Sequence, residues 1–140
     1  MRDERPRLTD QQVIVQGGWH PRYARVLAIA TDGDHGFALV DGNGDGAELE
    51  EELWEWNDGH WAGRVSAGGG GLDWLAPLRV WWPYADVCFA WGRAPGRQSV
   101  TLTVARERHQ VQVGADGVWA FVMAQPGLQA DGEPVLTDLS

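Results

Sequence analysis

The amino-acid sequence predicts an all-β fold: an antiparallel β-sandwich, or a partly closed barrel, of about ten short strands with little or no helix. Short runs rich in valine, isoleucine and aromatic residues recur between turn signals. The chain has 19 glycines without a repeating period, which implies many tight turns. Its nine tryptophans need a large buried surface, and no window keeps apolar residues at the helical period for three turns.

The expected strands alternate with glycine- and proline-containing turns. Residues 99–105 show the strand period most simply, because valine and leucine alternate there with threonine. Residues 118–124 are apolar throughout, which is typical of a central strand covered on both faces. The other strands are expected at 12–16, 24–31, 36–41, 78–82, 86–91, 109–113 and 134–139, and as a hairpin over 52–65.

That hairpin, "ELWEWNDGHWAGRV", is the clearest local signal in the chain. Asp58 and Gly59 tolerate the positive φ angles of a two-residue turn, which pairs Trp56 with Trp61. Because side chains alternate across a strand, one face is expected to be buried and the other wet. The buried face carries Trp54, Trp56, Trp61 and Val65, and the wet face carries Glu55, Ala62 and Arg64, whose opposite charges interact diagonally.

The run of four glycines at 68–71 divides the chain into two halves. We expect a single domain over 1–140, because a first half of about 60 residues would be only marginally stable alone. The alternative is a two-half organisation, 8–66 and 74–140, joined by the glycine-rich loop 67–73.

Composition excludes several classes of partner. The net charge of −9 repels phosphate backbones, so no nucleic acid is expected. No low-charge run is long enough to cross a membrane, and the start "MRDERPRLTDQQ" lacks the apolar core of a secretory signal. We therefore expect a cytoplasmic location, with which a single cysteine, Cys88, agrees. Every basic residue is arginine, a pattern typical of a bacterium with a GC-rich genome.

The stretch "DGNGDGAELEEE" matches the spacing of a calcium loop. Alternate residues of a tight loop can direct oxygens toward one ion, and calcium takes six to eight of them. The candidate ligands are Asp41, Asn43, Asp45 and Glu52. However, Glu48 occupies a position that is normally apolar, and the flanks read as strands. We prefer an acidic turn between two strands, and calcium is the only cofactor left open.

Two aromatic clusters are candidate binding surfaces. The first is Trp19, Arg22 and Tyr23, which form a recognition loop or a cap on an open end of the sandwich. The second contains Trp81, Trp82 and Tyr84. Adjacent Trp81 and Trp82 must point to opposite faces of a strand, so at least one is expected to be accessible to solvent.

Catalysis has little support in the sequence. The four histidines are scattered, and none of the three serines lies in a nucleophile motif. In "TDGDHG", Asp32 lies near His35, the best pair for a hydrolase-like site. Such a histidine is more often part of a turn, so we expect no enzyme. Cys88 lies in an apolar strand and is expected to be an inert buried thiol.

The segment "GRAPGRQSVTLTVARERHQVQVGADGVWAFV", residues 92–122, resembles the strand pairs of bacterial immunoglobulin-like and transthyretin-like modules. In those modules a valine-rich strand, a polar hairpin and a strand beginning with Asp-Gly and an aromatic residue recur. The resemblance implies a β-sandwich scaffold, which carries no fixed function.

The sequence thus favours a non-catalytic bacterial binding module whose partner is another protein. The contact surface would be an acidic edge at 45–55 or an exposed tryptophan patch. A carbohydrate-binding module is the alternative, and it requires a flat row of exposed tryptophans within 74–91. A calcium-binding protein and a hydrolase using Asp32 and His35 also remain open. Unpaired strand edges and exposed aromatics are compatible with a homodimer.

Overall fold

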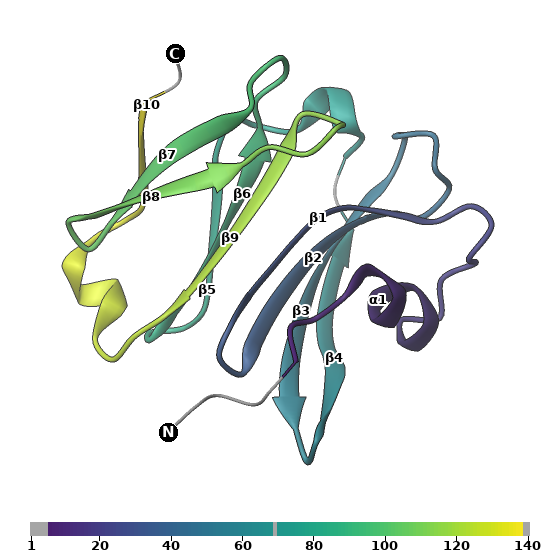
Figure 1. Ribbon diagram of the computed structural model, residues 1–140, viewed down its shortest axis with the longest axis horizontal. Coiled ribbons are helices and arrows are strands. Elements are labelled where there is room, and N and C mark those ends of the chain that lie inside the picture. The colour runs from purple at the N-terminus through teal and green to yellow at the C-terminus, as the bar shows by residue number, and fades with distance from the viewer. Residues whose placement is uncertain (1–5, 69, 139–140) are drawn as a thin grey trace.

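The computed structural model describes residues 6–68 and 70–138, which form three antiparallel sheets (Figure 1). The first sheet has the order β1-β2-β3-β4, the second β5-β6-β9 and the third β10-β7-β8. None is closed into a barrel, and the all-β prediction is confirmed. The strands are β1 (Arg25–Asp32), β2 (His35–Asp41), β3 (Leu49–Asn57), β4 (His60–Gly68), β5 (Arg79–Tyr84), β6 (Val87–Arg93), β7 (Ser99–Val104), β8 (Glu107–Gln112), β9 (Val118–Ala124) and β10 (Val135–Asp138).

The sheet β5-β6-β9 is covered on both faces. Successive residues of β6 point in opposite directions, so Phe89 enters one core while Cys88 and Ala90 enter another. The first core packs this sheet against Leu27, Phe37, Leu39, Leu49 and Leu53 of the four-stranded sheet. The second packs it against Val100, Leu102 and Val104. The first core therefore contains residues from both sides of the glycine-rich loop.

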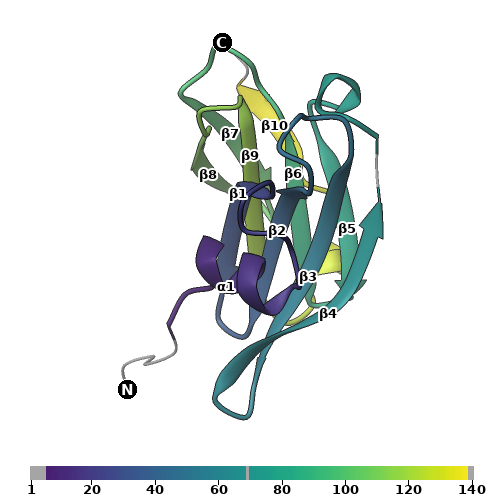
Figure 2. The same ribbon diagram turned by 90° about the vertical axis from the view of Figure 1, so that its right-hand side faces the viewer.

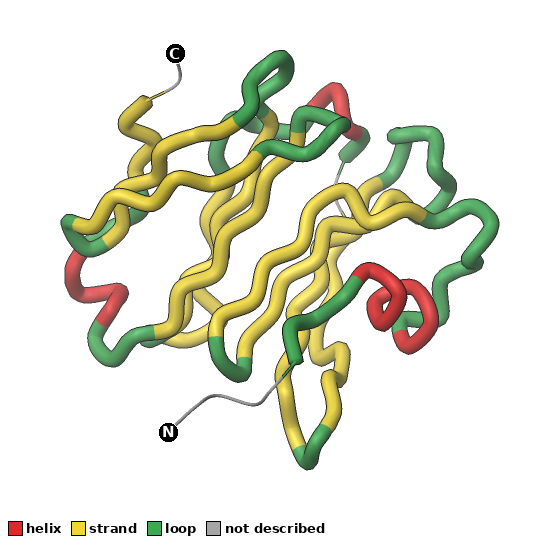
Figure 3. The backbone as a smooth tube through the Cα atoms, viewed as in Figure 1, coloured by secondary structure: helices red, strands yellow, loops and turns green. Residues whose placement is uncertain are grey.

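In the part of the chain that the structure describes, helix is confined to three short segments outside the sheets (Figure 3). They are α1 (Asp10–Gln16) and the single 3₁₀ turns η1 (Leu72–Trp74) and η2 (Leu128–Asp131). Among the residues that the structure describes, no helix is long and apolar enough to span a membrane.

The prediction of a strand at 12–16 is wrong, because these residues form α1. Thr9 caps the helix: its side chain accepts a hydrogen bond from the Gln12 N–H, and the Gln12 side chain accepts one from the Thr9 N–H. This capping box outweighs the local β-propensity of valine and isoleucine. Val13 is fully buried, and with Leu8 it covers the outer face of the four-stranded sheet (Figure 2).

The β3–β4 hairpin has the predicted turn and register. Asp58 and Gly59 have φ angles of 53° and 83°, and Trp56 pairs with Trp61. The rings of these two tryptophans meet edge to face at 5.6 Å. Trp54 and Trp61 are buried under α1, as expected.

The predicted face of Val65 is wrong, because β4 contains a β-bulge. Leu53 pairs with Val65 and Trp54 with Gly63, so Arg64 is an extra residue. Val65 is therefore shifted to the face of Leu53, opposite to the buried tryptophans. The face expected to be wet is the inner face of the sandwich, where Leu53 is 3% exposed.

Strand β5 also extends further than predicted. It continues through Pro83 to Tyr84, across an irregularity in its pairing with β6 between Trp81 and Tyr84. Proline has no N–H to donate, so it is tolerated at this point, where the pairing of the two strands is interrupted. The last strand, expected at 134–139, is β10; residue 139 lies outside the described residues.

Candidate functional site

The four-stranded sheet and the β5-β6-β9 sheet are closed at one edge and open at the other. At the closed edge β1 lies alongside β9 (Figure 1). There the Asp32 carboxylate accepts a hydrogen bond of 2.9 Å from the Ala124 N–H. At the opposite edge lie β4 and β5, which pair only with β3 and β6 within the described part of the chain. The two outermost strands are therefore left without a second neighbour (Figure 2).

A groove of about 550 Å³ lies between β4 and β5 at this open edge. Its lining combines an aromatic surface with two opposite charges. The residues are Glu51, Ala67, Arg79, Val80, Trp81 and Trp91. Burial raises the pKa of Glu51, and the guanidinium of Arg79 opposes that rise. The Trp81 ring packs edge to face against Phe89 at 5.6 Å, and this contact orients the aromatic wall of the groove.

The groove continues toward η1. A second hollow of about 100 Å³ shares Glu51 and Arg79 with it and extends to Gly70, Gly71 and Trp74. Trp74 is 83% exposed and is the most exposed large apolar side chain among the described residues. The open edge therefore has an aromatic residue at its rim.

A polar cluster on Glu55 of β3 links this sheet to Tyr84 at the end of β5. The Tyr84 hydroxyl donates to Glu55 Oε2 at 2.9 Å, and Arg64 Nε lies 3.3 Å from Glu55 Oε1. His35 Nδ1 is 3.8 Å from Oε2. The hydrogen bond to Glu55 is the largest cause that raises the pKa of Tyr84, and burial raises it further. The predicted diagonal pair of Glu55 and Arg64 is thus present, and it lies inside the sandwich edge.

A third hollow, of about 240 Å³, lies on the opposite face of β3 and β4 from the groove, beside the end of α1. At its floor Glu52 is only 8% exposed. Its two oxygens accept hydrogen bonds of 3.0 Å from the indole N–H groups of Trp19 and Trp54. Burial raises the pKa of Glu52, and the two indole bonds oppose that rise.

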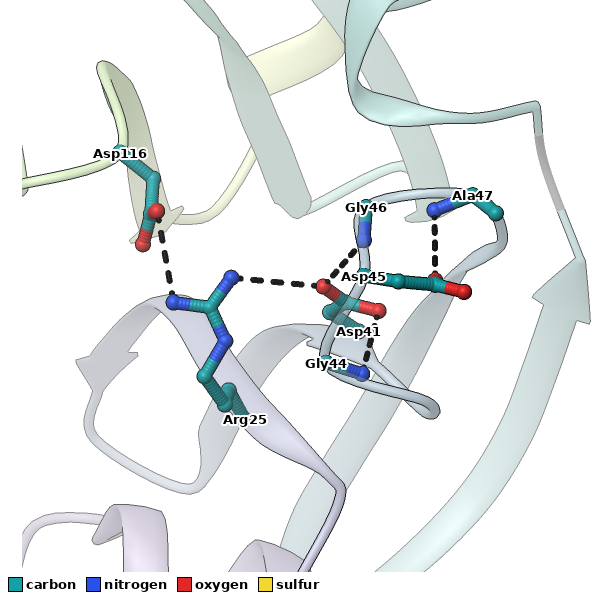
Figure 4. A network of polar contacts seen from close by, with 7 residues as sticks. All are labelled: Arg25, Asp41, Gly44, Asp45, Gly46, Ala47 and Asp116. Atoms are coloured by element: carbon teal, nitrogen blue, oxygen red, sulfur yellow. Dashed lines mark hydrogen bonds and ion pairs between the residues drawn. The ribbon is translucent and has the colours of Figure 1, made fainter.

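The structure does not bring the four predicted calcium ligands together. The Asp41 carboxylate is fully buried and accepts hydrogen bonds from the Gly44 and Gly46 N–H groups, at 3.0 and 2.8 Å (Figure 4). Arg25 lies 3.5 Å from the same carboxylate and also reaches Asp116. Asp45 accepts from the Ala47 N–H at 2.9 Å.

The fourth ligand, Glu52, is bonded to tryptophans instead, and Asn43 is exposed. Within residues 6–68 and 70–138, no three acidic, histidine or cysteine side chains are grouped to hold a metal ion. The geometry is that of an acidic turn closed by Asp41, and calcium binding stays a prediction.

The residues of the first aromatic cluster lie in two different environments. Trp19 is half-buried and anchors its loop to Glu52. Tyr23 is 53% exposed and packs on His20 at 4.7 Å, while the Arg22 N–H donates to His20 Nδ1. This loop therefore caps an end of the four-stranded sheet, with Tyr23 on the outside.

The second cluster is split by the alternation of β5. Trp81 faces the inner groove, whereas Trp82 packs on the second core and donates to Glu133 at 3.0 Å. Both are partly exposed, and Tyr84 is 48% exposed. Trp91 is buried. Residues 74–91, all of them described, therefore do not present a flat row of tryptophans.

The two candidate catalytic residues, Asp32 and His35, contact different partners. Asp32 fixes the β1–β9 edge through Ala124, and His35 is directed to Glu55 and Tyr84. Cys88 is fully buried as predicted, and burial raises the pKa of its thiol to about 12.

Sequence reasoning named the acidic edge at 45–55 but missed the open edge of the sandwich and the placement of Glu51 and Glu52 on opposite faces of β3. The available signal was their adjacency within a predicted strand, because successive side chains of a strand point to opposite faces. No protein-family model, curated protein or solved structure matches the chain. The resemblance of residues 92–122 to immunoglobulin-like and transthyretin-like modules stays a prediction.

Proposed function

We propose that this chain is a non-catalytic bacterial protein of the cytoplasm that binds an extended segment of a partner protein by adding it to β4 as a further strand. The observation that carries this proposal is the outer edge of β4, which has no strand partner within the described residues and borders the groove on Trp81. Strand addition of this kind derives affinity from backbone hydrogen bonds and specificity from alternate side chains.

The edge of β4 is accessible along its second half. Residues 63–68 are all exposed, and they include small side chains that leave the backbone open to approach. Proteins usually protect a free edge with proline, lysine or inward-pointing charges. Such devices are confined to Arg64, a bulge residue held by Glu55; residues 65–68, which follow it, contain neither proline nor a charged side chain.

The groove supplies a place for side chains of the added strand. Cross-strand partners share a face, so residues beside Val65 and Ala67 point to the inner side. There they meet Trp81 and the stems of Glu51 and Arg79. Val65 shares the face of Leu53, is 50% exposed and also borders the hollow on Glu52, so an added strand would cover an apolar side chain at this edge.

A selection from random octapeptides displayed on phage tests this proposal. The wild-type protein is the target, and a Val65→Arg variant is used for counterselection. Val135→Arg is the matched control, because Val135 is 53% exposed on β10, away from the groove. We expect enriched peptides that bind the wild type and the control equally and Val65→Arg at least about ten-fold more weakly. Bound peptide should also slow amide hydrogen exchange at 65–68.

Other results would overturn strand addition. One is a selection that yields no peptide distinguishing Val65→Arg from Val135→Arg. Another is exchange protection confined to residues outside β4. Binding of a cello-oligosaccharide that perturbs Trp81, without any peptide binding, would favour the carbohydrate module instead. Dimerisation through β4, measured by sedimentation and abolished by Val65→Arg, would make a second copy the occupant.

A further inference from the structure

We infer that the hollow on Glu52 is a pocket for a lysine or arginine side chain of the bound segment, so that the preferred segment alternates basic and apolar residues. This inference rests on the proposed function, because it assigns the second face of the same added strand. The groove on Trp81 receives the apolar residues, and the hollow beside α1 receives the basic ones.

The first support is the environment of the Glu52 carboxylate. It is almost fully buried, and among the described residues no cationic group lies within ion-pair distance of it. A buried carboxylate is normally paired with a cation. Its two indole donors, Trp19 and Trp54, satisfy one position on each oxygen and leave a second position on each. A cationic donor is the group that completes this arrangement.

The shape of the hollow gives the second support. Its lining is small or polar along β4 and aromatic at its floor: Gln16, Gly17, Glu52, Trp54, Gly63, Arg64, Val65 and Ser66. Gly63 lies over the Trp54 ring, since a Cβ there would be 3.6 Å from ring atoms. A long side chain can therefore cross β4 over Gly63 and Ser66. Carboxylate, hydroxyl and ring are groups that bind an ammonium ion.

Register decides which residue of the segment enters. Ser66 pairs with Glu52, so a residue placed opposite Ser66 points to the Glu52 side. Its neighbours, opposite Val65 and Ala67, point to the groove. A strand added to β4 lies two strand spacings from β3, about 9.6 Å. The long flexible stem of lysine suits that span, whereas a short side chain would not reach.

The charges around the hollow are compatible with a cation. Glu50, two residues before Glu52, lies on the same face, and its charge contributes to raising the pKa of Glu52. Arg64 is the only cation in the lining, and its Nε is drawn to Glu55 on the inner face. A cation that enters can thus interact with both carboxylates without displacing a partner of Glu52.

The test compares two capped hexapeptides, one alternating valine and lysine and the other valine and glutamine, at fixed salt. We expect the lysine peptide to bind the wild type at least about ten-fold more tightly. Glu52→Gln should remove this preference, and Glu50→Gln should leave most of it. Ser66→Lys, which fills the hollow with a tethered ammonium, should also remove it. A second probe is n-butylammonium, with n-butanol as its neutral analogue, observed on the indole N–H signals of Trp19 and Trp54.

The outcomes separate the two proposals. Equal binding of both peptides overturns the basic pocket and leaves strand addition standing. If n-butylammonium shifts the two indole signals in the wild type but not in Ser66→Lys, while neither hexapeptide nor any selected octapeptide binds, the pocket stands and strand addition falls. If n-butylammonium acts no differently from n-butanol and the preference survives in Glu52→Gln and Ser66→Lys, the pocket is overturned. Thermal unfolding of each variant identifies any that fails to fold.

Discussion

The loop between β2 and β3 and the outer edge of β4 are both rich in glycine and small residues, yet the structure uses their polar groups differently. In the loop, backbone N–H groups are directed inward to Asp41, which Arg25 also contacts. Along β4, the outer backbone groups have no strand partner within the described residues. A segment whose polar groups bond one another is a structural element, whereas one that leaves them open can recruit a partner.

The sequence points to the loop as the better candidate site, whereas in the structure the edge of β4 is the better candidate. The loop has the spacing of a metal site, and β4 has no recognisable motif. The carboxylates of Asp41 and Glu52 differ in the same way in their hydrogen-bond donors. Asp41 has three donors from its own loop and sheet, whereas Glu52 has two indole donors and an adjoining hollow.

The largest effect is expected for Asp41→Ala. It removes a buried charged acceptor and leaves two loop N–H groups and Arg25 without it. Unfolding in urea should show a loss of about 2–4 kcal/mol. Asp45→Ala is the control, since Asp45 is exposed and accepts one backbone bond; it should lose less than about 1 kcal/mol. Equal losses would mean that Asp41 does not hold the loop.

Gly44→Ala should destabilise the same loop by about 1–3 kcal/mol. Gly44 has a φ of 75°, and an added Cβ would lie 2.4 Å from the Tyr23 carbonyl oxygen. Gly18→Ala separates the two causes, because Gly18 has a φ of 76° but open space around it. Its loss should be about 1 kcal/mol. If the two variants were equally stable, the close approach to Tyr23 would be refuted.

A smaller and pH-dependent effect is expected at Glu52. Its pKa is raised above 4.5 by burial, so the folded state binds the proton more tightly than the unfolded state. The resulting stabilisation is fully present below the unfolded pKa and is lost as pH rises through the folded pKa. The free energy of unfolding of the wild type should therefore fall relative to Glu52→Gln from about pH 4 to pH 7. A difference that stays flat across this range would contradict the burial of the carboxylate.

No effect is expected from calcium. Because both Asp41 oxygens already accept backbone hydrogen bonds and Glu52 lies elsewhere, adding calcium should leave the Tm unchanged. Thermal unfolding with calcium and with a chelator measures this. A calcium-dependent rise in Tm that disappears in an Asn43→Ala, Asp45→Ala double variant would show instead that the loop rearranges to bind the ion.

Several elements could be predicted because their causes are local. The Asp58-Gly59 turn needs two positive φ angles, and those residue types allow them. The alternation of 99–105 likewise predicts β7. Helix α1 was missed although its capping box is local, because the apolar run that it contains has the composition of a strand. The Arg64 bulge left no signal, and it changed the face on which Val65 lies.

The sequence by itself determined the all-β class, most strand positions and the register of the β3–β4 hairpin next to its turn, because these depend on side-chain period and turn conformation between neighbours in the chain. Only the tertiary structure decided which edge of the sandwich closes and which stays open. Asp32 reaches Ala124 across 92 positions, and Trp19 reaches Glu52 across 33. Such contacts depend on how whole sheets pack, and no local pattern records them. The candidate site exists because that packing brings β1 against β9 and, among the described residues, leaves β4 without a second strand partner.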